Sequence, residues 1–348
     1  MNQGNNDGPC PRSPAPTARQ ELGRRAFVHI LAAGLLGSPL PADAQPAGRV
    51  ARVGVLSGAS ATEHVYRLLP AALRELGYVE GKNLDFQWRW AEGRAERLPE
   101  LADDLVRLKV DAIVAVTNQP ILAAKRATTS IPIVMIAGLD PVAFGLVASL
   151  ARPGGNVTGT SASPPEIGGK ILEVLKEAIP GADRVTLVWD PSFPGMAPYA
   201  DHAAAVARAL NISLTYADIR NPADTEEVLG QIGRRRPHAL YVVPFGPLAA
   251  QLPRIFDFAA KQKLPAIYTG WGATIVEAGG LMSYGPNLDE TYRRSATFID
   301  KILKGAPPAA LPVEQPRKFD FIVNLRTAKA LGLTIAPSAL MRADRVIQ

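Results

Sequence analysis

Two acidic residues follow apolar runs of this sequence, and each is succeeded directly by a proline. Asp140 comes after IPIVMIAGL (131–139), and Asp190 ends the run RVTLVWD (184–190). Such a carboxylate can cap a helix, bind a ligand ammonium or act in acid–base catalysis. Proline suits the first helical position, because it lacks the N–H that would stay unpaired there. We therefore interpret Asp140 as a helix cap and leave ligand contact open for both acids.

Small polar side chains follow two further apolar runs. Ser57 and Ser60 come at and after RVGVLS (52–57), and Thr117 and Asn118 come at and after DAIVAVT (111–117). Hydroxyls beside a helix N-terminus can help to bind an anion such as an α-carboxylate, or they can simply cap the helix. Asn118 precedes Gln119-Pro120 and is the expected cap of the next helix. Ligand contact by Thr117 or Asn118 is a second possibility.

Aromatic residues follow the apolar runs of the second half. They are Phe193, Phe245 and Trp271, and Tyr284 lies in a glycine-flanked segment, GGLMSYGP (279–286). A similar segment, GGNVTGTSAS (154–163), contains Thr160. Aromatic side chains gathered at one site would stack on a flat or apolar ligand. A single aromatic residue in a loop often packs only against neighbouring side chains of the protein. We include these residues among the expected ligand contacts.

Enzyme signatures are missing from the sequence. No GxGxxG follows an apolar run, EIGGK (166–170) continues with Ile171 where a phosphate-binding loop has Ser or Thr, and no GxSxG occurs. The only cysteine is Cys10, and His64, His202 and His238 lack metal-ligand spacing. We therefore expect no enzyme activity, no cofactor and no metal. The basic residues are scattered, and Arg234–Arg236 is interpreted as a solvated helix end, so we expect no nucleic-acid partner.

Alternating apolar runs and amphipathic stretches must position these residues. From Arg52 to Leu150 the pattern predicts β-α-β-α-β-α-β followed by a short helix over PVAFGLVASL (141–150), and a similar alternation recurs from Arg184 to Gly270. The fold class is therefore α/β, with two doubly wound parallel-sheet lobes. Each lobe would place its ligand crevice at the carboxyl ends of its strands. The segments 154–163 and 279–286 are predicted to cross between the lobes as hinges.

The N-terminal region has the features of an export signal. Arg24-Arg25 precedes an apolar stretch from Ala26 to Leu36, and ADA (42–44) is a small-x-small cleavage pattern. The apolar stretch is shorter than the roughly 20 residues that span a bilayer. We expect residues 1–44 to be a disordered extension plus a cleaved, twin-arginine-like signal, with cleavage after Ala44. The mature chain would be periplasmic, without stable membrane insertion.

Four stretches carry a family resemblance. They are ELGYVEGKNLDFQWRWAEG (75–93), IPIVMIAGLDPVAFGLVASLARPGGNVTG (131–159), GGLMSYG (279–285) and LPVEQPRKFDFIVNLRTAKALGLTI (311–335). They resemble the ABC-transporter substrate-binding proteins of the tryptophan/tyrosine-uptake type, which have the type I periplasmic binding fold. The resemblance implies three crossing strands, with a third crossing near Leu311–Phe319. It also implies a small-molecule ligand held between the lobes and delivered to a membrane permease and its ATPase.

Taken together, these patterns predict one lobe from 50–157 and 286–312, and a second from 158–285 and 313–348. The predicted function is the solute-binding component of an ABC importer, which closes about a hinge on an amino-acid-like or aromatic ligand. Two alternatives stay open: a periplasmic sensing subunit that presents its closed state to a receptor, and an exported hydrolase. TEHVYRLL (62–69) and SFPGMAPY (192–199) match no family motif, so the ligand's identity is left undecided.

Overall fold

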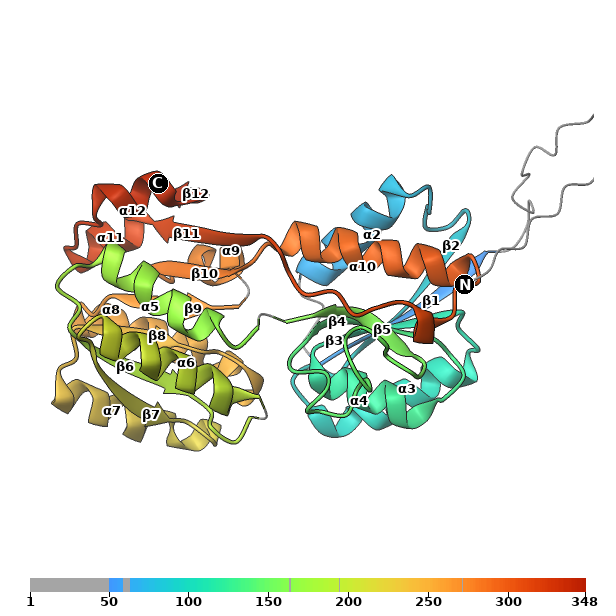
Figure 1. Cartoon of the computed structure of the whole chain (residues 1–348), viewed down its shortest axis with the longest axis horizontal. Coiled ribbons are helices and arrows are strands. Elements are labelled where there is room, and N and C mark those ends of the chain that lie inside the picture. Colours follow the sequence, from blue (N-terminus) through green and yellow to red (C-terminus); the bar gives the residue numbers. More distant parts are fainter. Residues whose placement is uncertain (1–49, 59–62, 163, 194, 271) are drawn as a thin grey trace, which may run out of the picture. The chain divides into compact units, whose positions relative to one another are not determined.

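The computed structural model describes residues 50–348 except 59–62, 163, 194 and 271, and it leaves out the side chains of 63–66 and 247. Residues Val50–Gln348 form one compact unit. The predicted export signal lies outside the described residues, as do Ser60 and Trp271. Within Val50–Gln348 the chain forms two β-sheets, each covered by helices on both faces (Figure 1).

The first sheet is entirely parallel and has the strand order β2-β1-β3-β4-β5. Its strands are β1 (Ala51–Ser57), β2 (Leu84–Trp90), β3 (Ala112–Val116), β4 (Ile133–Gly138) and β5 (Val157–Ser161). Helices α2 (Glu63–Glu75) and α10 (Leu288–Leu303) pack on one face, and α3 (Leu98–Arg107) and α4 (Asn118–Ala127) on the other. A short 3-10 turn, η1 (Ala95–Arg97), precedes α3.

Strand β3 shows why the sheet is buried on both faces. Its side chains alternate between the two faces, as they must in any strand. Val114 and Val116 join the cluster that contains α2 and α10, whereas Ile113 and Ala115 join the cluster of α3 and α4. Every residue of the strand is buried, which explains why its sequence is a continuous apolar run.

The second sheet has the strand order β12-β11-β10-β9-β8-β6-β7. Its strands are β6 (Arg184–Trp189), β7 (Ser213–Asp218), β8 (Ala239–Val242), β9 (Ala266–Thr269), β10 (Met282–Pro286), β11 (Phe319–Asn324) and β12 (Arg345–Ile347). One face carries α5 (Ile167–Ala178), α6 (Met196–Ala209), α11 (Leu325–Leu331) and α12 (Pro337–Arg342). The other carries α7 (Thr225–Arg235), α8 (Leu252–Gln262) and α9 (Gly272–Glu277). Three 3-10 turns complete the elements: η2 (Pro222–Asp224), η3 (Gly246–Gln251) and η4 (Pro308–Ala310).

The prediction of two α/β lobes with parallel sheets is confirmed, with one difference in the second sheet. Strand β11 runs antiparallel to β10, and the C-terminal strand β12 adds to the edge beyond it. The chain leaves the second sheet at the end of β10 and returns to it from the first sheet. It therefore enters β11 at the edge where β10 ends, and β11 runs in the opposite direction. Strand β5 pairs with β4 and extends the first sheet to Ser161, beyond the predicted lobe boundary at residue 157.

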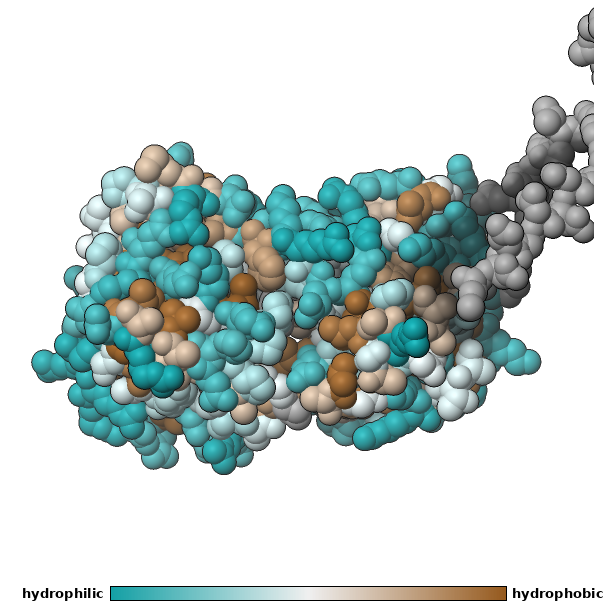
Figure 2. All heavy atoms as spheres, viewed as in Figure 1, coloured by the Kyte–Doolittle hydropathy of each residue, from teal (hydrophilic) through white to brown (hydrophobic). Residues whose placement is uncertain are grey.

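Helix α10 packs on the first sheet, although in the sequence it lies between β10 and β11 of the second sheet. Its Tyr292, Ala296 and Ile299 are fully buried against the first sheet. The chain therefore passes between the two sheets three times: at 162–166, at Asn287 and at 312–318 (Figure 1). We call these three connections the hinge segments, after the hinge motion expected from the sequence. On the face drawn in Figure 2, hydrophilic residues predominate and apolar residues occur in small groups.

Candidate functional site

Residues at the carboxyl ends of β1, β3 and β4 share one edge of the first sheet. The register pairs Ser57 with Val116, and Val116 with Ile136, so these strand ends are neighbours. Ser57 is buried, whereas Thr117, which directly follows β3, is half-buried. The structure thus brings three of the predicted strand-end positions, Ser57, Thr117 and Asp140, to one edge, as expected for parallel strands.

The backbone is strained at this edge. Thr117, Ala137 and Asp140 have φ angles of 68°, 54° and 39°, in the left-handed region that non-glycine residues avoid. Several other non-glycine residues with positive φ stand at helix ends, where this conformation is usual: Lys109, Asn211, Arg236 and Lys263. A strained backbone conformation persists only where the surrounding structure fixes it, and such residues are common at ligand-binding sites.

Asn118 is the residue that holds this edge together. Its side-chain Nδ2 donates to the carbonyl of Leu139 at 2.8 Å, and its Oδ1 accepts from the N–H of Leu139 at 2.7 Å. The predicted cap at Asn118 is therefore wrong: α4 begins at Asn118, and its amide is used to anchor the loop after β4. Only 2% of Asn118 is exposed, which leaves it in contact with protein on nearly all sides.

Asp140 caps a turn and not a helix. Its Oδ1 accepts from the N–H of Ala143 at 3.1 Å, and its carbonyl accepts from Phe144 N–H at 3.1 Å. Residues 141–150 form turns and bends, so the predicted helix over this segment is wrong. Gly145 lies within it at φ 62°, a left-handed conformation that interrupts helical geometry. Asp140 Oδ2 has no hydrogen bond to any described residue, and the side chain is half-buried.

The corresponding loop of the second sheet contains Asp190 and Phe193. Asp190 is 5% exposed, and its Oδ1 accepts from the N–H and the hydroxyl of Ser192 at 2.9 and 2.5 Å. Phe193 stacks on Phe245, with ring centroids 6.2 Å apart. Two of the aromatic residues expected to contact a ligand, Phe193 and Phe245, are therefore in contact with each other, although they lie on different loops.

The two loops also contact each other. The ring centroids of Phe144 and Phe193 are 6.4 Å apart. A Cβ atom added to Gly195 would lie 3.4 Å from Cβ of Asp140, so these two residues are neighbours. Leu139 packs into the hydrophobic cluster of the second sheet although it follows a strand of the first. The loops at the strand ends of both sheets thus place carboxylates and aromatic rings in one region.

Thr160 and Tyr284 have other surroundings. Tyr284 stacks on Phe319 with centroids 5.9 Å apart, and burial raises the pKa of its hydroxyl above the usual 10.0. Thr160 is buried in β5, and its Oγ1 lies 3.3 Å from Oγ of Ser295 on α10. Tyr284 packs against the same hydrophobic cluster as Phe193 and Phe245, but its ring partner is Phe319.

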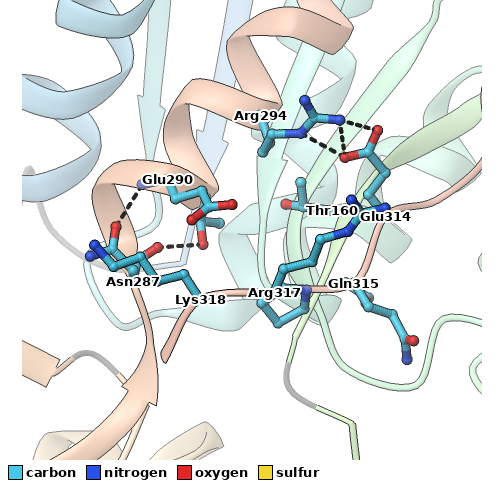
Figure 3. Close-up of a pocket in the computed structure, with 11 residues that line it drawn as sticks. Thr160, Asn287, Glu290, Arg294, Glu314, Gln315, Arg317 and Lys318 are labelled. Carbon is cyan, nitrogen blue, oxygen red and sulfur yellow. Dashed lines mark hydrogen bonds and ion pairs between the residues drawn. The ribbon is translucent and has the colours of Figure 1, made fainter. Parts of the chain in front are cut away.

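Thr160 lines a polar cavity of about 120 Å³ at the hinge segments, which we call the hinge cavity (Figure 3). Its lining comes from the end of β5, the start of α10 and the segment 314–318. Arg294 and Glu314 form a bidentate ion pair at its wall, with Nε and Oε2 2.7 Å apart. Figure 3 shows this pair on one side and Asn287 and Glu290 on the other.

Sequence reasoning missed Phe144, the Asn118–Leu139 pairing and the Arg294–Glu314 pair. Phe144 was assigned to a helix, and no local signal indicates that it contacts Phe193. Trp90 was also missed: it ends β2 beside Ser57 and stacks on Trp88 with centroids 5.5 Å apart. The alternation of LDFQWRW, which puts both tryptophans on one face, could have indicated this stack.

No helix within the described residues is long and apolar enough to span a membrane. No group of three or more His, Cys, Asp or Glu side chains in the same described residues could hold a metal ion.

Comparison with known proteins identifies relatives over nearly all of the described chain. The family model for ABC transporter substrate binding protein matches residues 50–347. A curated relative, the tyrosine-binding protein of Clostridioides difficile (strain R20291), is 28% identical over 262 residues, which cover 75% of this chain and 74% of the relative.

Two solved structures share the fold. The ABC domain in complex with L-Trp from Streptococcus pneumonia superposes with a TM-score of 0.77 at 25% identity, covering 85% of this chain and 99% of that chain. The ligand-free, open structure of a substrate binding protein with adhesive properties from Clostridium difficile gives 0.65 at 26% identity, covering 86% and 100%. The fold is that of the type I periplasmic binding proteins, and the chain belongs to the ABC transporter substrate-binding protein family.

Proposed function

We propose that this protein is the periplasmic solute-binding component of an ABC importer and that it binds an amino acid with an aromatic or apolar side chain. The observation that carries this proposal is the contact between the strand-end loops, where Phe144 lies 6.4 Å from Phe193 and Asp140 lies beside Gly195. Relatives named for tyrosine binding and crystallised with L-Trp support the same ligand class.

The two ends of such a ligand would meet different chemistry. Phe193 and Phe245 offer stacked rings that suit a flat side chain. Asp140 and Asp190 offer carboxylates for an ammonium group, which forms charge-assisted hydrogen bonds with them. The printed hydrogen bonds of both acids use Oδ1, and Asp140 is the better placed of the two because it is half-buried whereas Asp190 is only 5% exposed.

Hinge closure is the mechanism that we propose for capture. Ligand contacts from both lobes would favour the closed form over the open one. The three hinge segments are the places where backbone rotation would occur.

The test is ligand binding by the mature chain after bound ligand has been removed by unfolding and refolding. We expect L-tryptophan, L-tyrosine, L-phenylalanine or L-leucine to bind with saturable heat in calorimetry and to raise the melting temperature. Phe193→Ala should weaken binding about 5- to 160-fold, because a buried aromatic contact contributes about 1–3 kcal/mol. Tyr216→Ala, which removes an exposed aromatic on β7, is the matched control. Equal losses in both variants, or no binding of any of these amino acids, would contradict the proposal.

The role of Asp140 can be tested with a ligand that lacks the ammonium group. If L-tryptophan binds, 3-indolepropionate should bind at least about tenfold more weakly to the wild-type protein, since it forms no charge-assisted bond to the acid. Asp140→Asn should reduce that difference, whereas Asp190→Asn should leave most of it. The opposite ranking would assign the ammonium to Asp190.

Export is proposed from the N-terminal sequence alone. Expression of the full chain in a Gram-negative host should give a periplasmic product that begins at Gln45. A product that retains residues 1–44 in the cytoplasm would refute the proposed location.

A further inference from the structure

Leu139 joins the two lobes through apolar packing. It follows β4 of the first sheet, yet it belongs to the hydrophobic cluster of the second sheet. Among the described residues of that cluster, every other member lies at position 162 or later in the chain. A Cβ atom added to Gly195, which directly precedes α6, would lie 3.3 Å from both Cγ and Cδ2 of Leu139. The leucine side chain therefore packs against the opposite lobe, and it is only 8% exposed.

The first lobe holds the backbone of Leu139 in place. Asn118 of α4 pairs with both the N–H and the carbonyl of Leu139, at 2.7 and 2.8 Å. The preceding carbonyl, that of Gly138, accepts from the N–H of Ala162 at 2.8 Å. The side chain is thus offered to the second lobe from a backbone that is already fixed. Little ordering is then needed when the lobes meet, which lowers the entropic cost of their contact.

Leu146 lies on the same loop and differs from Leu139 in the lobe against which it packs. It is 2% exposed and belongs to the cluster that contains α3 and α4 of the first sheet. Lys125 of α4 donates to its carbonyl at 3.1 Å. Loss of the Leu146 side chain would therefore weaken the first lobe alone, whereas loss of the Leu139 side chain would weaken the contact between the lobes.

We propose that Leu139 is a positioning residue for ligand capture: its packing against the second lobe favours the closed form and strengthens the binding of every ligand of the cleft by the same factor. Opening of the lobes would expose this apolar side chain to water, which is unfavourable. A residue that changes only the population of the binding-competent form changes the apparent affinity for all ligands alike. The inference rests on the proposed binding function and its hinge closure, but not on which amino acid is bound.

Calorimetry of the mature chain tests the equal factor, with two amino acids that bind among L-tryptophan, L-tyrosine, L-phenylalanine and L-leucine. Leu139→Ala should raise the Kd of both by about tenfold or more, because truncation removes much of the packing between the lobes. Leu139→Met, which nearly conserves the volume, should keep most of the affinity. Leu146→Ala should lower the unfolding midpoint in urea and leave both Kd values within about twofold of the wild type.

A disulfide bond can measure the approach of the lobes without any ligand. A Cβ atom at position 195 would lie 3.4 Å from Cβ of Asp140, close to the separation of about 3.5–4.5 Å found in disulfides. The only cysteine of the sequence is Cys10, so a mature chain that begins at Gln45 has none. The double variant Asp140→Cys, Gly195→Cys therefore introduces a single pair, which should form a disulfide within the monomer under mild oxidation.

The rate of this trapping should depend on Leu139. Adding Leu139→Ala to the double-cysteine variant should slow disulfide formation severalfold, whereas adding Leu146→Ala should leave the rate unchanged. Gly195 has a φ angle of 83°, so a cysteine there is strained, but this strain is common to all the proteins compared.

The two measurements separate failure of this inference from failure of the proposed function. If no amino acid binds while Leu139→Ala still slows trapping, the proposed function fails and the closure role of Leu139 stands. If amino acids bind but Leu139→Ala changes neither the Kd values nor the trapping rate, the inference is overturned. A loss of affinity for one ligand alone would overturn it by assigning Leu139 to direct ligand contact. An equal effect of Leu146→Ala, or no disulfide in the double-cysteine variant, would also overturn it.

Discussion

Replacing Asn118 with alanine should show how much the loop after β4 depends on one side chain. The amide of Asn118 pairs with both the N–H and the carbonyl of Leu139, at 2.7 and 2.8 Å. Leu139 is only 8% exposed, so water cannot readily replace the lost partner. An unpaired buried backbone group costs about 1–3 kcal/mol, and two such groups should lower the free energy of unfolding by about 2–6 kcal/mol.

Denaturant unfolding in urea, followed by circular dichroism, measures this loss as a lower midpoint at an unchanged slope. Asn156→Ala is the matched control: its Nδ2 also donates to two backbone carbonyls, those of Thr128 and Ile131, but the residue is only half-buried. Asn118→Asp should also be destabilised, since a carboxylate offers no N–H to the Leu139 carbonyl. A loss below about 1 kcal/mol for Asn118→Ala, or one no larger than that of Asn156→Ala, would refute the reasoning.

Two further predictions concern the backbone and alkaline stability. Gly159→Ala should destabilise the protein by about 3 kcal/mol or more, because φ is 127° and the added Cβ would lie 2.3 Å from the Met135 carbonyl oxygen; Gly155→Ala, with open space around it, is the control in the same urea assay. Burial, followed by the hydrogen bond to Asp300, raises the pKa of Tyr78 from 10.0 to about 12. This folded-state pKa lies above the unfolded one, so the stability contributed by Tyr78 is present below pH 10 and is lost as the pH rises from 10 through 12. Tyr78→Phe should therefore show a smaller fall in unfolding midpoint between pH 10 and 12 than the wild type, and an equal fall in both proteins would contradict this.

The helices and strands could be predicted where apolar periodicity is long and uninterrupted. Strand β3 and helix α10 are examples, because their patterns reflect burial of two faces or of one stripe. The segment 141–150 was predicted wrongly, although its composition suits a helix. Tertiary contacts replaced local propensity there, since Gly145 adopts a positive φ and Lys125 donates to the carbonyl of Leu146 at 3.1 Å.

The candidate site was only partly predictable. The rule that ligands bind at the carboxyl ends of parallel strands placed Asp140 and Phe193 on two loops that the structure brings into contact. It could not indicate that Phe193 stacks on Phe245 and meets Phe144, because these contacts depend on how two loops from different sheets approach each other.

The sequence by itself determined the α/β class, the two-lobe repeat, the family and the residue types at the strand ends. All of these can be read from the spacing of apolar residues or from continuous motifs. Only the tertiary structure decided that Asn118 anchors Leu139, that Asp140 caps a turn, and that β11 runs antiparallel to β10. It alone showed that Arg294 of α10 forms an ion pair with Glu314 of the connection before β11. The physical reason is that hydrogen-bond pairing and burial depend on groups that lie far apart in the chain, and no local pattern records which of them meet.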